Sequence, residues 1–222
     1  SGLTYAETAA LLGVEVGAVK TRLHKARRTL RKRLWTTWRE EDMTAATDAQ
    51  LVDMRVADVR RAPAAGDKPE RYLVLLEEVG GARRLPLWIG SFEGEALALA
   101  LEGVQAPRPL AYTLAVQLLQ AAGGRLREVH ISRVQDGVIY AVAVVAGSGG
   151  GGDIDARPSD ALNLAMVVGA PIRAEPGVLD AEAAMQASAP ERTRGMQSAF
   201  YGAGSVGAAD IAAEIAARFA AR

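Results

Sequence analysis

The sequence predicts an α+β fold, with a largely antiparallel or mixed sheet covered by helices and a small all-α helix-turn-helix segment before it. Half of the 222 residues are hydrophobic and 23% are charged, an ordinary balance for a globular protein. Segments that predict strands come in groups of three, and helical segments follow each group. Because strands and helices do not alternate one by one, a doubly wound parallel sheet is not expected.

The charges divide the chain into unlike parts. Lys and Arg total 26 and Asp and Glu total 26, yet residues 1–39 hold nine basic and two acidic side chains. This gives +7 there and −7 on the remaining 183 residues. We expect a helix-turn-helix over 1–38, a linker over 39–50, an acidic domain over 51–180, and a linker with a C-terminal helix over 181–222.

The N-terminal segment predicts two helices. Thr4 and Glu7 have the spacing of a capping box, which predicts a helix from about residue 5 to residue 12, and Gly13 ends it. Apolar residues then recur every three or four positions from Val19 to Leu34, and the opposite face is basic. One side of this second helix can pack while the other meets phosphates.

In the acidic domain the pattern predicts three strands, two helices, three strands and one helix. The strands are expected at 51–61, 72–79, 85–89, 126–134, 138–146 and 153–156, and the helices at 92–104, 110–122 and 159–168. From about 181 to 209 the composition predicts a linker. An amphipathic helix with Ile211, Ile215 and Phe219 on one face should follow.

Two segments, Gly2 to Val14 and Gly17 to Arg27, resemble the helix-turn-helix of the C-terminal domain of extracytoplasmic-function sigma factors. In that family the second helix enters the major groove of promoter DNA. The resemblance implies that the residues contacting nucleic acid are Lys20, Thr21, Arg22, Lys25 and Arg28. The family's domain has further helices before this pair. The alternative is a solvated basic helix that serves as a spacer or an oligomer contact.

Four motifs in the acidic domain resemble the bifunctional nuclease domain family over about residues 51–180. They are Leu85-Pro-Leu-Trp-Ile-Gly90 with the helical segment to Gly103, Pro107-Arg-Pro-Leu110, Ile154-Asp-Ala-Arg-Pro-Ser-Asp-Ala-Leu162, and Gly169-Ala-Pro-Ile172. The resemblance implies hydrolysis of phosphodiester bonds in DNA and RNA with little sequence preference. The resemblance assigns no catalytic residues, so the candidates follow from the chemistry of the side chains present.

Carboxylates are the candidate catalytic groups, because the chain has no Cys and only two His. Asp153 and Asp155 lie two apart on an extended segment, so they share a face, and Asp160 falls in the first turn of the next helix. These three are candidate ligands for a divalent metal such as Mg²⁺. Arg157 lies between them, where it can pair with a carboxylate or neutralise a scissile phosphate.

The candidate catalytic residues are Asp155, Arg157, Asp160 and Glu95. Glu93 and Glu95 lie about 200° apart around a helix, so they cannot both face one site. The alternative is purely structural: Asp160 stabilises the helix dipole, and Arg157 pairs with Asp155 to fix the turn. Tyr112 and Trp88 are candidates for stacking on bases, although a Trp in a strand is more often part of a core.

Two classes of function remain. The first is a nuclease that acts on DNA or RNA and is recruited to DNA by its basic segment. The second is a non-enzymatic DNA-binding transcription regulator whose body binds a partner or ligand. Converging carboxylates around Asp155 would favour the first class, and separated, ion-paired carboxylates the second. A cytoplasmic location without a membrane partner is expected, because the sequence shows neither a long apolar span nor a signal peptide pattern. The sequence leaves open whether the chain forms a homo-oligomer.

Overall fold

The computed structural model describes residues 4–19, 51–62, 64, 70–147, 150–188, 202 and 204–221. The chain divides into two compact units, Ser1–Ala49 and Gln50–Arg222. In the first unit, helix α1 (Tyr5–Leu12) has the predicted capping box: the Glu7 N–H donates to Thr4 Oγ1, and the Thr4 N–H donates to Glu7 Oε2. Gly13 ends the helix in the left-handed conformation, as predicted.

A second helical turn begins at residue 16 and continues to Val19, the last described residue of this segment. Val19 and Ala9 are buried. The described residues do not include the rest of the predicted second helix or the predicted linker at 39–50. They also do not include the predicted nucleic-acid contacts, which are Lys20, Thr21, Arg22, Lys25 and Arg28. Their roles therefore stay predictions.

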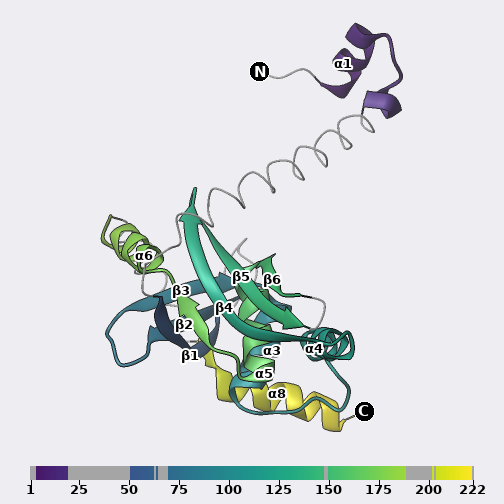
Figure 1. Ribbon diagram of the computed structural model, residues 1–222. Coiled ribbons are helices and arrows are strands. Elements are labelled where there is room, and N and C mark those ends of the chain that lie inside the picture. The colour runs from purple at the N-terminus through teal and green to yellow at the C-terminus, as the bar shows by residue number, and fades with distance from the viewer. Residues whose placement is uncertain are drawn as a thin grey trace. The chain divides into compact units, whose positions relative to one another are not determined.

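The second unit is built on a mixed sheet of eight strands in the described part of the chain, which confirms the predicted class (Figure 1). The strands are β1 (Val52–Ala62), β2 (Arg71–Glu78), β3 (Arg84–Ile89), β4 (Gly124–Gln135), β5 (Val138–Gly147), β6 (Gly152–Ala156), β7 (Ile172–Ala174) and β8 (Val206–Gly207). Their order is β3-β2-β1-β7-β4-β5-β6, and β8 pairs with β1. Neighbours are antiparallel except β4 and β7, which are parallel.

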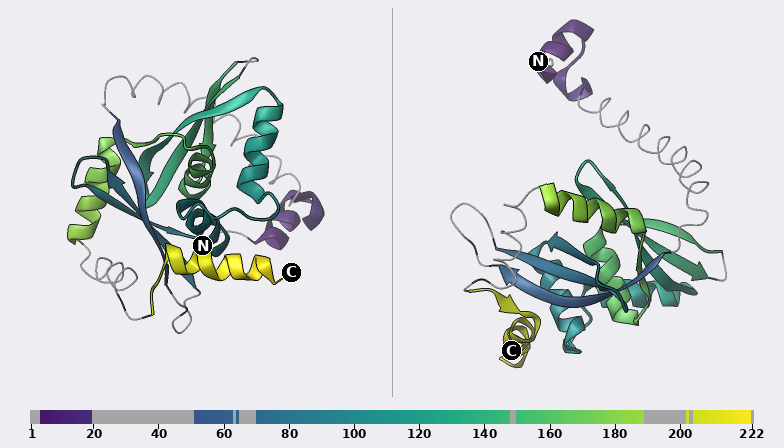
Figure 2. Two further views of the ribbon diagram at one scale, coloured as in Figure 1. Left: turned by 90° about the horizontal axis from the view of Figure 1, so that it is seen from below. Right: turned by 90° about the vertical axis from the view of Figure 1, so that its left-hand side faces the viewer.

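Five helices are described in this unit: α3 (Ser91–Leu101), α4 (Ala111–Ala121), α5 (Pro158–Val168), α6 (Pro176–Ser188) and α8 (Ala208–Ala220). Helix α3 packs on β1 and β2, and α5 packs on β4 and β5. Figure 2 shows α3 beside α5 and α8, and all three contribute buried residues to the main core. No helix in the described ranges is long and apolar enough to cross a membrane.

Helix α3 approaches the sheet closely because position 94 has no side chain. A Cβ placed on Gly94 would lie 2.2 Å from Cγ of Tyr72, which is fully buried on β2. Real Cβ atoms do not approach other atoms so closely, so any larger residue would displace the helix or the ring. The N-terminal turn of α3 is thereby seated on β2.

The architecture repeats a simple unit. Strands β1-β2-β3 and strands β4-β5-β6 each form an antiparallel meander, and each meander leads directly into a helix. Helix α3 starts two residues after Ile89, and α5 starts two residues after Ala156. The short strand β7 lies between β1 and β4 and joins the two halves. Each half therefore contributes one helix N-terminus at the end of its third strand.

The C-terminal region corrects one prediction. The sequence was expected to become a linker at about 181, but residues 176–188 form α6, which packs against β3 and β4 and buries Val178 and Leu179. The predicted C-terminal helix is confirmed as α8. Its apolar side buries Ile211 and Ile215 against α3 and β1.

Candidate functional site

The N-termini of α3 and α5 meet at an arginine. Glu93 and Asp160 occupy the third position of their helices, after the N-cap residues Gly90 and Arg157. Arg157 Nε donates to Asp160 Oδ2 at 2.7 Å and its Nη2 donates to Asp160 Oδ1 at 3.0 Å. The same Nη2 donates to Glu93 Oε1 at 2.8 Å. One guanidinium thus links a carboxylate from each half of the sheet.

Two further side chains complete this group. The Tyr112 hydroxyl on α4 donates to Asp160 Oδ1 at 2.8 Å. Asn163, one turn after Asp160, is buried, and its Nδ2 donates to the Glu93 carbonyl at 3.0 Å and to the Ser159 carbonyl at 2.9 Å. We call Glu93, Tyr112, Arg157, Asp160 and Asn163 the arginine cluster.

The hydrogen bonds set the protonation states of the cluster. Burial alone would raise the pKa of Asp160, but the hydrogen bonds from Arg157 and Tyr112 outweigh it and hold the pKa below its ordinary value. Burial, followed by the bond to Asp160, raises the pKa of the Tyr112 hydroxyl. The bond to Asp160 also raises the pKa of Arg157. At neutral pH the cluster therefore holds an Asp160 carboxylate, a neutral Tyr112 and a cationic Arg157.

Two atoms of the cluster are free to act on a ligand. The Arg157 side chain is 67% exposed, and its Nη1 makes no hydrogen bond within the described residues. The Glu93 side chain is 15% exposed, and its Oε2 likewise has no hydrogen-bond partner in that part of the chain. The N-termini of two helices add positive potential here. The site can therefore receive an anion beside a carboxylate oxygen that can accept a proton.

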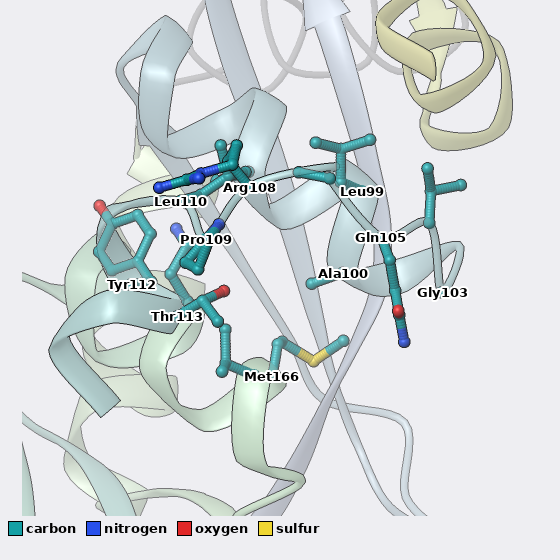
Figure 3. Close-up of a pocket in the computed structure, with 15 residues that line it drawn as sticks. Leu99, Ala100, Gly103, Gln105, Arg108, Pro109, Leu110, Tyr112, Thr113 and Met166 are labelled. Carbon is teal, nitrogen blue, oxygen red and sulfur yellow. The ribbon is translucent and has the colours of Figure 1, made fainter. Parts of the chain in front are cut away.

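A pocket adjoins the arginine cluster (Figure 3). It has a volume of about 460 Å³ and is bounded by α3, α4, α5 and the segment that joins α3 to α4. Tyr112 and Asn163 line it, so they belong both to the pocket and to the cluster. A molecule bound in the pocket would therefore contact two members of the arginine cluster.

Residues 74–187, just over half of the chain, match the family model of the bifunctional nuclease domain. The chain belongs to this family. Residues 1–30 match sigma-70 region 4, so both sequence resemblances are confirmed. Two proteins from Mycobacterium tuberculosis, strains CDC 1551 / Oshkosh and ATCC 25618 / H37Rv, are 37% identical over 132 residues, which is 60% of this chain and 73% of theirs. Both are described only as uncharacterized proteins.

Within the bifunctional nuclease domain, the three candidate metal ligands do not come together. Asp153 and Asp155 on β6 are exposed and pair with Val144 and Val142 of β5. The alternate β5 residues, Ala141 and Ala143, face the core with α5, so the two aspartates point to the opposite side of the sheet from Asp160. Nowhere in the described ranges do three or more His, Asp or Glu side chains gather as a metal site.

The structure brings Arg157 and Asp160 together but leaves Asp155 and Glu95 outside the cluster. The expected alternative pair of Arg157 with Asp155 is also not formed, because Arg157 binds Asp160 and Glu93. Glu95 lies instead near Tyr72, whose pKa is raised by burial and then by the charge on Glu95. Glu93 takes the place assigned to Glu95, in keeping with their opposite directions around α3.

The two aromatic candidates have different surroundings. Trp88 is half-buried on β3, and the Arg71 guanidinium lies 4.5 Å from the centre of its ring. Tyr112 is held by its hydrogen bond to Asp160. The most exposed large apolar side chain of the described residues is Phe92, 85% exposed, directly before Glu93 in α3. Phe92 is not among the site residues predicted from the sequence, although its position in the first turn of a helix, beside an acidic residue, is a local signal.

Proposed function

We propose that the chain is a nuclease that hydrolyses phosphodiester bonds in DNA and RNA with little sequence preference, and that its basic N-terminal segment recruits it to DNA. Membership of the bifunctional nuclease domain family supports the class of reaction. The observation that carries the choice of site is the exposed Arg157 guanidinium, held by carboxylates at two helix N-termini. The match to sigma-70 region 4 supports recruitment.

In this proposal Arg157 binds the scissile phosphate through Nη1. The guanidinium stabilises the additional negative charge that develops on the phosphoryl oxygens when water attacks phosphorus. Asp160 and Tyr112 act as positioning residues, because Asp160 holds Arg157, Tyr112 holds Asp160, and neither touches the phosphate. The fixed geometry of the guanidinium removes reorganisation at the moment of reaction.

Glu93 is the proposed general base. Its Oε1 is occupied by Arg157, and its Oε2 is free to accept a proton from the attacking water. The bond from phosphorus to the leaving oxygen breaks, and that oxygen takes a proton from solvent. Gly90 is part of this arrangement, because a Cβ there would lie 2.4 Å from Glu93 Oε2. The carboxylate is thus seated against the backbone at the start of α3.

A divalent metal does not fit Asp153, Asp155 and Asp160, the three ligands predicted for it from the sequence. Asp153 and Asp155 lie on the far side of the sheet from Asp160, and both Asp160 oxygens already accept hydrogen bonds. No step of the proposed mechanism is routed through a metal ion. In the proposed reaction, Arg157 supplies the charge stabilisation and Glu93 supplies the base.

The test is cleavage of plasmid DNA and single-stranded RNA by the purified full chain, with and without added Mg²⁺ or Mn²⁺. Arg157→Gln and Glu93→Gln should each lower the rate by at least about 10²-fold, the usual cost of losing a charge-stabilising donor or a general base. Asp155→Asn and Glu95→Gln are the matched controls, since each removes a carboxylate outside the cluster. Equal rates for all four variants would overturn the site, and the absence of cleavage by the wild type would overturn the activity.

One observation favours a second candidate, a DNA-binding regulator whose body binds a partner or ligand. The carboxylates of the cluster are ion-paired, and the three candidate metal ligands are separated. The regulator would show salt-sensitive DNA binding without cleavage. Replacing Lys20, Arg22 and Lys25 together would abolish that binding, while cleavage of DNA by the wild type would exclude this candidate.

A further inference from the structure

The pocket beside the arginine cluster has the size and lining of a small-molecule site. Its volume of about 460 Å³ falls in the range of about 300–1,000 Å³ that ligand pockets occupy. Apolar side chains of α3 and α5, among them Leu99, Ala100 and Met166, form much of its lining (Figure 3). Such a surface suits a flat apolar ring.

The charge in the pocket has one sign. Arg108 is the only charged side chain among its 15 lining residues, and no Asp or Glu lines it. Arg108 is exposed and makes no ion pair or hydrogen bond within the part of the chain that the structure describes. Gln105 and Thr113 add an amide and a hydroxyl. The pocket therefore favours an anionic ligand that also has hydrogen-bonding groups.

The polar groups are distributed along the pocket. In Figure 3, Arg108 lies at the same end as Tyr112, and Gln105 lies at the other end beside Gly103. Tyr112 is bonded to Asp160, and Asn163 is bonded to the Glu93 carbonyl, so this lining leads directly into the arginine cluster. A ligand with its anionic group on Arg108 would thus lie at the end of the pocket where Tyr112 connects the lining to the arginine cluster.

We propose that this pocket binds a nucleoside monophosphate unit, with its phosphate on Arg108 and its base against the apolar lining. The choice of ligand rests on the proposed nuclease function: the unit is then a neighbour of the phosphate held by Arg157. The same chemistry is offered by a nucleotide within a strand and by a free mononucleotide. Arg108 is in either case a binding residue that the reaction itself does not require.

The test is calorimetric titration of the full chain with AMP, adenosine and inorganic phosphate. AMP should bind, and adenosine and phosphate should each bind more weakly, since each lacks half of the contacts. Arg108→Gln should weaken AMP binding by about tenfold or more, the equivalent of one hydrogen bond to a charged group. Arg125→Gln is the matched control: Arg125 is also exposed but does not line the pocket, so AMP affinity should change by less than about twofold.

A second variant and a competitor make the result specific. Ala100→Leu narrows the pocket and should weaken AMP binding without removing a charge. A phosphorothioate-linked tetradeoxyadenylate, which resists cleavage, is then added to the AMP complex. Displacement of AMP assigns the pocket to a unit of the strand, and retention of AMP assigns it to a free nucleotide. No AMP binding at millimolar concentration, or binding unchanged by Arg108→Gln, would overturn the proposal.

The cleavage assay separates this proposal from the proposed function. Cleavage without AMP binding overturns the pocket assignment and leaves the nuclease in place. AMP binding that depends on Arg108, without cleavage by the wild type, supports the pocket assignment and overturns the nuclease. The pocket would then be the ligand site of a regulator.

Discussion

The hydrogen bond between Tyr112 and Asp160 is a measurable part of the stability of the chain. Tyr112→Phe removes only the hydroxyl, which donates at 2.8 Å to a carboxylate oxygen. A hydrogen bond to a charged group contributes about 1.5–3 kcal/mol. Because the Asp160 side chain is still 30% exposed, we expect the low end, a loss of about 1.5 kcal/mol in the free energy of unfolding.

Asp160→Asn tests the same bond from the other side. It also weakens the pair with Arg157, which contributes no more than about 1 kcal/mol because the Arg157 side chain is 67% exposed. The total expected loss is about 1.5–2.5 kcal/mol. In the double variant the shared bond is counted once, so the coupling energy should be about 1–1.5 kcal/mol.

The measurement is urea unfolding of the full chain followed by far-ultraviolet circular dichroism, with the slope against urea compared across all variants. Tyr140→Phe serves as the control, because the Tyr140 ring is held by Arg133 at 4.3 Å rather than by a hydrogen bond from its hydroxyl in the described residues. It should lose less than about 0.5 kcal/mol. A coupling energy below about 0.3 kcal/mol would refute the reasoning that Tyr112 holds Asp160.

Three further predictions follow from described contacts. The pKa of Tyr112 is raised in the folded chain, so the stabilisation by its protonated hydroxyl is complete below about pH 10 and is lost as the pH rises above that value. The free energy of unfolding of Tyr112→Phe should therefore fall less than that of the wild type between about pH 10 and 11. Equal decreases in the two proteins would contradict this. Gly94→Ala should lower the free energy of unfolding in urea by about 1–3 kcal/mol or more, because the added Cβ meets Tyr72. Gly177→Ala is the control, and it should be neutral or stabilising because its Cβ meets open space. Similar effects at both positions would show that α3 does not approach β2 as described. Phe92→Ser should change the free energy of unfolding by less than about 0.5 kcal/mol, because the side chain is exposed. In a fluorescence titration it should weaken binding of single-stranded DNA by about 1–3 kcal/mol. Unchanged binding would exclude stacking of a base on Phe92.

The elements with strong periodicity were predictable, and those defined by distant partners were not. The alternation in β1 to β6 and the turn signal at Asp136-Gly137 are local, and the structure confirms them, with both turn residues at positive φ. Strand β7 has only three residues, too few to show a period, and it exists because β1 and β4 pair with it from either side. The sequence pattern did not predict helix α6, because its buried side includes a charged residue, Glu182, which interrupts the apolar stripe.

The site was partly predictable for the same reason. Arg157 and Asp160 are three residues apart, so their pairing could be expected from the chain itself. Glu93 lies 64 residues before Arg157, and only the packing of α3 against α5 brings it there. Asp155 was misplaced because a strand segment fixes which residues share a face but not which face the following helix covers.

Because β7 has only three residues, the arginine cluster is an important additional connection between the two halves of the domain. The two meanders share no direct strand pairing in the described sheet, and β7 joins them through three residue pairs on each side. Arg157 crosses this seam, because it belongs to one half and binds Glu93 of the other. A ligand that contacts Arg157 Nη1 and Glu93 Oε2 would therefore touch both halves. A ligand that binds only the folded chain, present at about 100 times its dissociation constant, would add about 2.7 kcal/mol to the free energy of unfolding, so occupancy of the site would stabilise both halves together.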